Sequence, residues 1–340
     1  MQDRYFQIDF LRGISIVGVV IIHVLSYSLT TPFYIFTWNY LHFVIAAFIF
    51  CSGYVMMARY KSGFDSIGHV LKWYKKRLTR LLVPYYIYLL VHYMLLILLP
   101  MYFGGSGLKL EADYIASSIF LSGGIDLNWL TLLFVQLTLL FPVLVHLTPL
   151  KKSYYMYAGG AVLIALIFTF YRFPYDQYRS VMWIPWSFIL ILSMQCYFLH
   201  SKGLKTKTYL KMMAVSGAIF AVLYFLVKQL HWSDRIIDHK YPPDLYDLSF
   251  ESTITLAVLA LSNWNPLHVP VIKRASTFLS QESYHIFFIH YILIDLVQHI
   301  KTAYPVFVHV PVQLIFVLTL SIVIAYMLRK LLETINVKLT

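Results

Sequence analysis

Long apolar runs recur along the whole chain, and short polar or charged stretches separate them. Each run has about 18 to 22 residues, the length that a helix needs to cross roughly 30 Å of hydrocarbon. The runs fall near residues 13–31, 38–58, 81–101, 127–147, 154–171, 181–200, 212–231, 249–267, 283–300 and 307–329. This pattern predicts an all-α polytopic membrane protein with about ten transmembrane helices. No hydrophilic stretch is long enough for a separate soluble domain, so we expect one transmembrane domain over residues 1–340.

The composition supports the same class of protein. Of the 340 residues, 60% are hydrophobic and only 12% are charged, which is too apolar for a soluble globular domain of this size. The two cysteines, Cys51 and Cys196, lie within apolar runs and lack the spacing of metal ligands. We therefore expect buried, inert thiols, no metal site and no tightly bound cofactor.

The basic residues predict the orientation of the chain. If the amino terminus is cytoplasmic, the inner segments hold 20 of the 27 lysines and arginines and the outer loops hold 7. Such a bias is typical of cytoplasmic loops, and an even number of helices then puts both termini in the cytoplasm. The net charge of +12 thus reflects membrane topology, and we expect membrane lipids and no nucleic acid as partners. The inner basic residues are Arg4, Arg12, Arg59, Lys61, Lys72, Lys75, Lys76, Arg77, Arg80, Lys151, Lys152, Lys202, Lys205, Lys207, Lys211, Lys273, Arg274, Arg329, Lys330 and Lys338.

Arg12 and His23 are 11 residues apart in the first apolar run. On an α-helix this spacing gives a rotation of about 1100° and a rise of about 16 Å, so the two side chains share one face. Arg12 is then expected at the cytoplasmic interface and His23 near the middle of the hydrocarbon. Each residue alone could be structural, with Arg12 reaching lipid phosphates and His23 bonding to a neighbouring helix. Together on one face they favour function, because ionisable groups inside a bilayer are costly.

A basic segment at residues 72–80 precedes the third run and contains Lys76, Arg77 and Arg80. It could anchor the protein to anionic lipid head groups, or it could hold a phosphate-rich carrier such as coenzyme A beside Arg12. Charge alone does not separate these two interpretations.

Other polar residues are predicted at similar depth in the membrane. Ser283 and His290 lie seven residues apart on one face of the ninth helix, and His92 and Gln136 belong to the third and fourth helices. We therefore predict a polar cluster near the midplane of the membrane. For any single one of these residues, a hydrogen bond between helices is the commoner reason for its presence there. The outer segment 238–246 combines aromatic and charged residues, which suits either sugar binding or anchoring at the interface.

Four segments together resemble the acyltransferase 3 family of integral-membrane proteins. They are DFLRG at residues 9–13 with its spacing to His23, FIFCSGY at 48–54, RLTRLLVPY at 77–85 and SYHIFFIH at 283–290. The resemblance spans nearly the whole chain. It implies a ten-helix core, an acyl-coenzyme A donor that approaches from the cytoplasm, and an acceptor modified at the membrane or outside. By the same resemblance His23 is the essential catalytic histidine and Arg12 binds the donor.

The chain departs from the family pattern at two places. Phe134 stands where the family's Trp-x-x-x-x-Glu segment, which begins here at Trp129, has its glutamate, and Gln136 is a possible polar substitute. The chain also stops at Thr340 without the extracytoplasmic esterase-like domain that some members carry.

We therefore expect an O-acyltransferase of the cell membrane that moves an acetyl or other short acyl group from acyl-coenzyme A to a hydroxyl of an envelope or exported polysaccharide. His23 is the expected general base. The expected partners are acyl-coenzyme A and a glycan or lipid-linked glycan. A polysaccharide exporter of the same family and an enzyme with a lipid acceptor stay open as alternatives. The expected donor-binding residues are Arg12, Asp9, Lys76, Arg77 and Arg80, and the expected supporting residues are Ser283, Tyr284, His290, Gln136 and His92.

Overall fold

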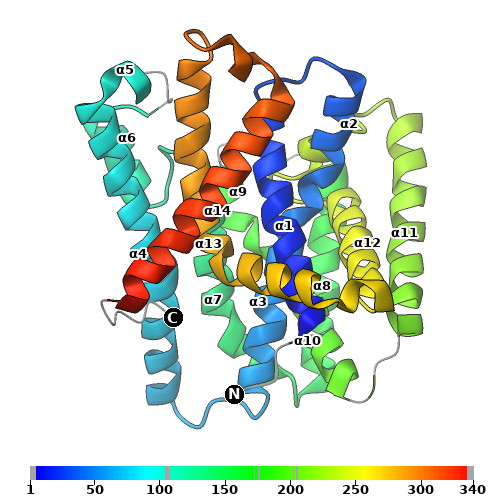
Figure 1. Ribbon diagram of the computed structural model, residues 1–340. Helices are drawn as coiled ribbons and strands as arrows, with labels where there is room; N and C mark the ends of the chain where they lie inside the picture. Colours follow the sequence, from blue (N-terminus) through cyan, green and yellow to red (C-terminus); the bar gives the residue numbers. More distant parts are fainter. Residues whose placement is uncertain are drawn as a thin grey trace.

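The computed structural model describes residues 5–103, 108–171, 173–174, 177–201, 203 and 206–334. Within these residues the chain forms helices and no β-strand (Figure 1). The α-helices are α1 (Phe6–Leu25), α2 (Pro32–Tyr40), α3 (Val44–Tyr60), α4 (Ile67–Leu98), α5 (Pro100–Phe103), α6 (Ala112–Ile119), α7 (Asn128–Leu147), α8 (Lys151–Phe170), α9 (Tyr178–Val181), α10 (Trp183–Ser201), α11 (Thr206–Gln229), α12 (Leu245–Leu261), α13 (Pro270–Ile300) and α14 (Val310–Thr334). Short 3-10 turns η1 (Leu41–Phe43), η3 (Ile236–His239), η4 (Asn265–His268) and η5 (Pro305–Val308) lie between them.

Eight helical segments in the described part of the chain are long and apolar enough to cross a membrane. They are α1, the continuous stretch from α2 through η1 to α3, α4, α7, α8, the stretch from α9 to α10, α11 and α14. The other two predicted runs correspond to α12, which has only 17 residues, and to α13, which carries several charges along its 31 residues. Both run through the same bundle as the others (Figure 1). The prediction of an all-α polytopic membrane protein is confirmed.

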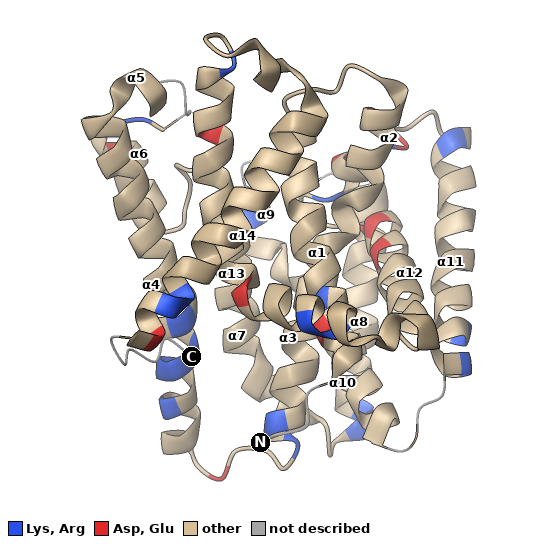
Figure 2. Cartoon of the chain, viewed as in Figure 1, with Lys and Arg blue, Asp and Glu red and all other residues tan. Residues whose placement is uncertain are grey.

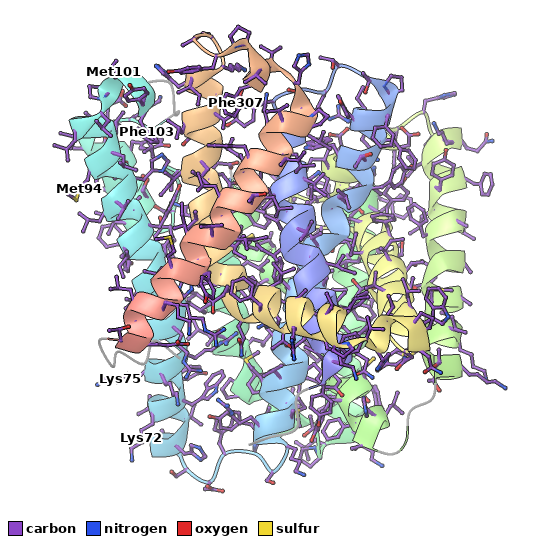
Figure 3. The ribbon with its side chains drawn as sticks, viewed as in Figure 1. Lys72, Lys75, Met94, Met101, Phe103 and Phe307 are labelled. Atoms are coloured by element: carbon purple, nitrogen blue, oxygen red, sulfur yellow. The ribbon has the colours of Figure 1, made fainter. Side chains whose placement is uncertain are left out.

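Helix α4 is much longer than the apolar run that predicted it. It begins at Ile67 instead of near residue 81, because the basic segment is part of the helix. Its 32 residues span about 48 Å, more than the roughly 30 Å of a hydrocarbon core. Lys72 and Lys75 lie at its lower end, and Met94 lies near its upper end (Figure 3). The cationic turns of α4 therefore extend beyond the apolar part of the bundle.

The charges are distributed unevenly along the bundle axis. Lysines and arginines gather at the lower ends of α4, α11 and α14 and at the start of α13 (Figure 2). The start of α1 and the end of α14 both lie in the lower half of the same view, as an even number of crossings requires (Figure 1). That this end faces the cytoplasm stays a prediction from the charge bias. Arg4, Lys202, Lys205 and Lys338 lie outside the described residues.

Helix α1 is at the centre of the bundle. It packs against α3, α12, α13 and α14, and most of it is buried, whereas most of α11 is exposed at the periphery. Small residues permit the close approaches: a Cβ on Gly18 would come within 2.8 Å of Val44 on α3. A Cβ on Gly53 of α3 would overlap Ser193 and come within 2.6 Å of Leu190, both on α10. These contacts hold α1 against α3, and α3 against α10.

Candidate active site

His23 lies in the last turn of α1, next to two neighbouring residues of α13. Its Nδ1 atom is 3.0 Å from Nε2 of His290, and its Nε2 atom is 2.9 Å from the hydroxyl of Tyr291. The sequence placed His23 in the middle of its helix, but α1 begins and ends several residues earlier than the apolar run. The upper end of α1 lies below the upper ends of α2 and α13, so this last turn is still inside the bundle (Figure 1).

The hydrogen bonds assign the protons of the two neutral imidazole rings. His290 Nδ1 is 3.1 Å from the carbonyl oxygen of Ile286, which can only accept, so this nitrogen carries the proton. His290 Nε2 must then accept from Nδ1–H of His23. The remaining nitrogen of His23, Nε2, has a lone pair and accepts from the Tyr291 hydroxyl. The arrangement therefore produces a base at one defined atom.

A hollow with about 480 Å³ of empty space, part of it open to the exterior, lies against His23. The wall combines apolar side chains of α1, α3 and α7 with aromatic and polar groups. The polar and aromatic lining residues are His23, His42, Asp126, Trp129, Lys240, Tyr241, Phe287 and Tyr291.

Lys240 is a lining residue that sequence reasoning did not single out. The segment after η3 folds into the bundle, so Lys240 is only 2% exposed and its Nζ atom is 3.1 Å from Nδ1 of His42. The ammonium is 5.9 Å from the ring centre of Trp129. Burial lowers the pKa of Lys240, and the charges of Glu251 and Asp247 oppose that shift. A buried cation thus lies in the same hollow as the base.

Arginines gather toward the other end of α1. The Arg77 guanidinium of α4 is close enough to Arg12, Arg80 and Arg59 to feel their charges. The Nε atoms of Arg12 and Arg77 are buried and have no hydrogen-bond partner among the described residues. Grouped cations with unused donors can bind phosphate. Lys76, by contrast, is exposed on α4.

Asp9, one turn before Arg12, is buried and accepts a 3.5 Å hydrogen bond from the hydroxyl of Thr277 on α13. Its carboxylate therefore joins the Arg12 end of α1 to α13.

A second, smaller hollow of about 190 Å³ lies beside Arg77. Ile49 of α3 and Phe134 of α7 line it, while Ile45 and Leu130 of the same helices line the His23 hollow. Each pair is four residues apart, so about 6 Å, or one helical turn, separates the two hollows. Phe134, the position of the family's glutamate, is thus in the wall of the hollow beside the arginines.

The model of the acyltransferase 3 domain matches residues 5–330, nearly the whole chain. The chain belongs to the acyltransferase 3 family. No curated protein and no solved structure gives a significant match. The protein is therefore a multi-pass membrane acyltransferase, and the contact between His23 and His290 lies at the centre of that domain.

Three other expected site residues of this acyltransferase have no recorded hydrogen bond to His23 in the described part of the chain, and two of them connect helices. Ser283 donates to the carbonyl of Ser280 at 3.1 Å, and Tyr284 donates to the carbonyl of Leu81 on α4 at 2.6 Å. Gln136 donates to the carbonyl of Arg179 at 2.8 Å. Tyr284 thus joins α13 to α4, Gln136 joins α7 to α9, and Ser283 bonds only within α13.

His92 lies on α4, away from His23. Its Nδ1 atom is 2.9 Å from the hydroxyl of Tyr88, and its Nε2 atom is 2.9 Å from a carboxylate oxygen of Asp295 on α13. These contacts join α4 to α13, which is the structural role that the sequence left open for an intramembrane histidine.

Proposed function

We propose that this acyltransferase moves an acetyl or other short acyl group from acyl-coenzyme A to a hydroxyl of an envelope or exported polysaccharide in the cell membrane. The observation that carries the proposal is the unprotonated Nε2 of His23, oriented by His290 and placed against an open, partly aromatic hollow. A base within hydrogen-bond reach of a bound hydroxyl is the group that acyl transfer to oxygen needs.

In the proposed reaction, the acceptor hydroxyl displaces Tyr291 and donates to Nε2 of His23. Its oxygen attacks the thioester carbonyl as the proton moves to His23, and a C–O bond forms. The C–S bond then breaks, the thiolate of coenzyme A leaves, and it takes the proton back from His23. The imidazolium is stabilised by its Nδ1–H bond to His290.

The arginine group supports coenzyme A as the donor. Arg12 and Arg77 offer buried guanidinium donors to phosphates, and Arg12 lies about 16 Å from His23 along the same helix. We expect the phosphates at this end of the bundle and the thioester near His23. The uneven basic charge favours a cytoplasmic position for this end, where such donors occur.

The wall of the His23 hollow supports a sugar as the acceptor. Trp129 and Tyr241 offer aromatic faces, and His42 and Asp126 offer hydrogen-bonding groups. Sugars present both apolar C–H faces and hydroxyls, so they fit a wall that combines the two kinds of group, whereas a lipid tail needs only the first.

The test is transfer of label from radiolabelled acetyl-coenzyme A by purified protein in lipid nanodiscs, with polysaccharide from the host envelope as acceptor. The wild type should label the glycan, and His23→Ala should lower the rate about 10²- to 10⁴-fold. His92→Ala, a histidine that is also buried but lies outside the hollow, is the matched control. Equal labelling by His23→Ala would refute the role of the base. Label in the lipid fraction would identify a lipid acceptor, and glycan transport without acylation would favour an exporter.

A further inference from the structure

Lys240 has no assigned role in the reaction, although it lies in the same hollow as the base. It is only 2% exposed, and it is close enough to His23 for its charge to act on the imidazole. Its one recorded hydrogen bond is to Nδ1 of His42. An ammonium group has three donors. Two N–H bonds of Lys240 therefore have no recorded partner among the described residues.

The carboxylates near Lys240 balance its charge without binding it directly. Asp247 and Glu251 lie one turn apart on α12 and are completely buried. Both oxygens of Asp247 are without a hydrogen-bond partner among the described residues, and Glu251 accepts from Trp186 at 3.1 Å. A purely structural buried lysine needs direct pairing to offset its desolvation. This one is held with its donors available to the hollow.

We propose that Lys240 is a further catalytic residue, whose ammonium stabilises the negative charge that develops on the acyl carbonyl oxygen during transfer. The inference rests on the proposed function, because it assigns a partner to the oxygen that His23-assisted attack creates. When the acceptor oxygen adds to the carbonyl carbon, the C=O π electrons move to oxygen and Lys240 donates a hydrogen bond to it. The carbonyl re-forms as the C–S bond breaks, and Lys240 keeps its proton throughout.

The charge around the hollow favours a transient anion over a permanently anionic acceptor. Among the described lining residues, Lys240 is the only lysine or arginine. Asp126 lines the same hollow, and Asp247 and Glu251 exert their charge on Lys240. These carboxylates would repel an acidic glycan, whereas they would not repel a neutral hydroxyl. The cation is thus suited to charge that appears only in the transition state.

The experiment measures kcat and both KM values for Lys240→Met, Lys240→Gln and Lys240→Arg in nanodiscs with acetyl-coenzyme A and the acceptor glycan. Loss of one oxyanion donor lowers kcat about 10²- to 10³-fold, so Met and Gln should show this loss with little change in either KM. Lys240→Arg keeps a cationic donor and should be at least tenfold more active than Met. Lys228→Met is the control, because Lys228 is an exposed lysine paired with Asp234. Thermal unfolding of each variant reports folding.

The outcomes separate this inference from the proposed function. A wild type with no transfer from acetyl-coenzyme A overturns both. The inference alone is overturned if the wild type is active, His23→Ala is inactive, and the kcat of Lys240→Met is within threefold of the wild-type value. A rise in either KM without loss of kcat also overturns it, since Lys240 would then bind substrate only. If the Met variant fails to fold, equal activities of folded Gln and Arg variants overturn it, and a tenfold advantage of Arg supports it.

Discussion

Replacement of His290 by leucine tests the proton assignment at the base. The wild-type bond from His23 Nδ1 to His290 Nε2 is 3.0 Å long and is buried on the His290 side. Leucine fills a similar volume but cannot accept a hydrogen bond. The Nδ1–H of His23 would then have no partner, while the alternative tautomer could donate from Nε2 to the oxygen of Tyr291.

The magnitude follows from the cost of that unpaired donor. An unsatisfied buried N–H costs about 1–3 kcal/mol, which changes the ratio of the two tautomers about 5- to 150-fold. Only the tautomer whose Nε2 carries no proton can take the proton from the acceptor hydroxyl. We therefore expect His290→Leu to lower kcat by about 5- to 150-fold, with an unchanged KM for acyl-coenzyme A, because the arginines are at the other end of α1.

The assay combines steady-state acetyl transfer in nanodiscs with ¹⁵N NMR of labelled histidines, which distinguishes protonated from unprotonated ring nitrogens. His290→Gln keeps an acceptor at this position and should recover most of the rate. His92→Leu is the control, because it removes a histidine of equal burial whose contacts are with Tyr88 and Asp295. An unchanged kcat in His290→Leu, or an unprotonated Nδ1 of His23 in the wild type, would refute the reasoning.

Three further predictions follow from the site and its packing. Arg77→Gln should raise KM for acyl-coenzyme A about 10- to 150-fold, because it removes one charge-assisted hydrogen bond to a phosphate. Lys75→Gln on the exposed face of α4 should leave this KM unchanged. Equal KM values in the two variants would contradict a phosphate site. Tyr291→Phe removes the donor that competes for the base, so acceptor KM should fall about fivefold at constant kcat, and a rise would contradict the displacement step. Gly53→Ala should destabilise the protein by about 1–3 kcal/mol in thermal unfolding, because its methyl group would overlap α10. Gly159→Ala on α8 meets nothing within 4 Å and should be neutral or stabilising by up to about 1 kcal/mol; equal effects at both sites would exclude the packing argument.

Hydrophobic periodicity is sufficient to predict the helices and the face that Arg12 and His23 share. The rotation of about 1100° over 11 residues does not depend on where the helix ends, so it survives the shift of α1 toward the amino terminus. Depth does depend on the ends, which is why His23 lies in the last turn and not in the middle. The contact with His290 could be expected from similar depth, but not its geometry, because the sequence does not show which helices are neighbours.

The position of Lys240 could not be predicted because distant contacts fold its segment inward. The backbone N–H of Ile236 donates to the side chain of Asn39, 197 residues away, at 2.8 Å. The backbone N–H of Leu245 donates to Thr169, 76 residues away, at 3.2 Å. From composition alone, this segment suits either sugar binding or anchoring at the interface. Only these tertiary hydrogen bonds convert it into the wall of the site.

The separation of the two hollows explains how donor and acceptor can approach from opposite ends without a continuous channel. Ile45 and Ile49 on α3 and Leu130 and Phe134 on α7 line successive levels about 6 Å apart. A coenzyme bound by its phosphates at the arginines needs to extend only its slender acyl-bearing arm past this turn. The bulky glycan stays on the His23 side, because the packed side chains of this turn, among them the fully buried Ile49, have to move apart to admit even the slender arm. In the proposed reaction the packed turn therefore acts as a size filter, and the thioester carbonyl is the part of the donor that meets the acceptor.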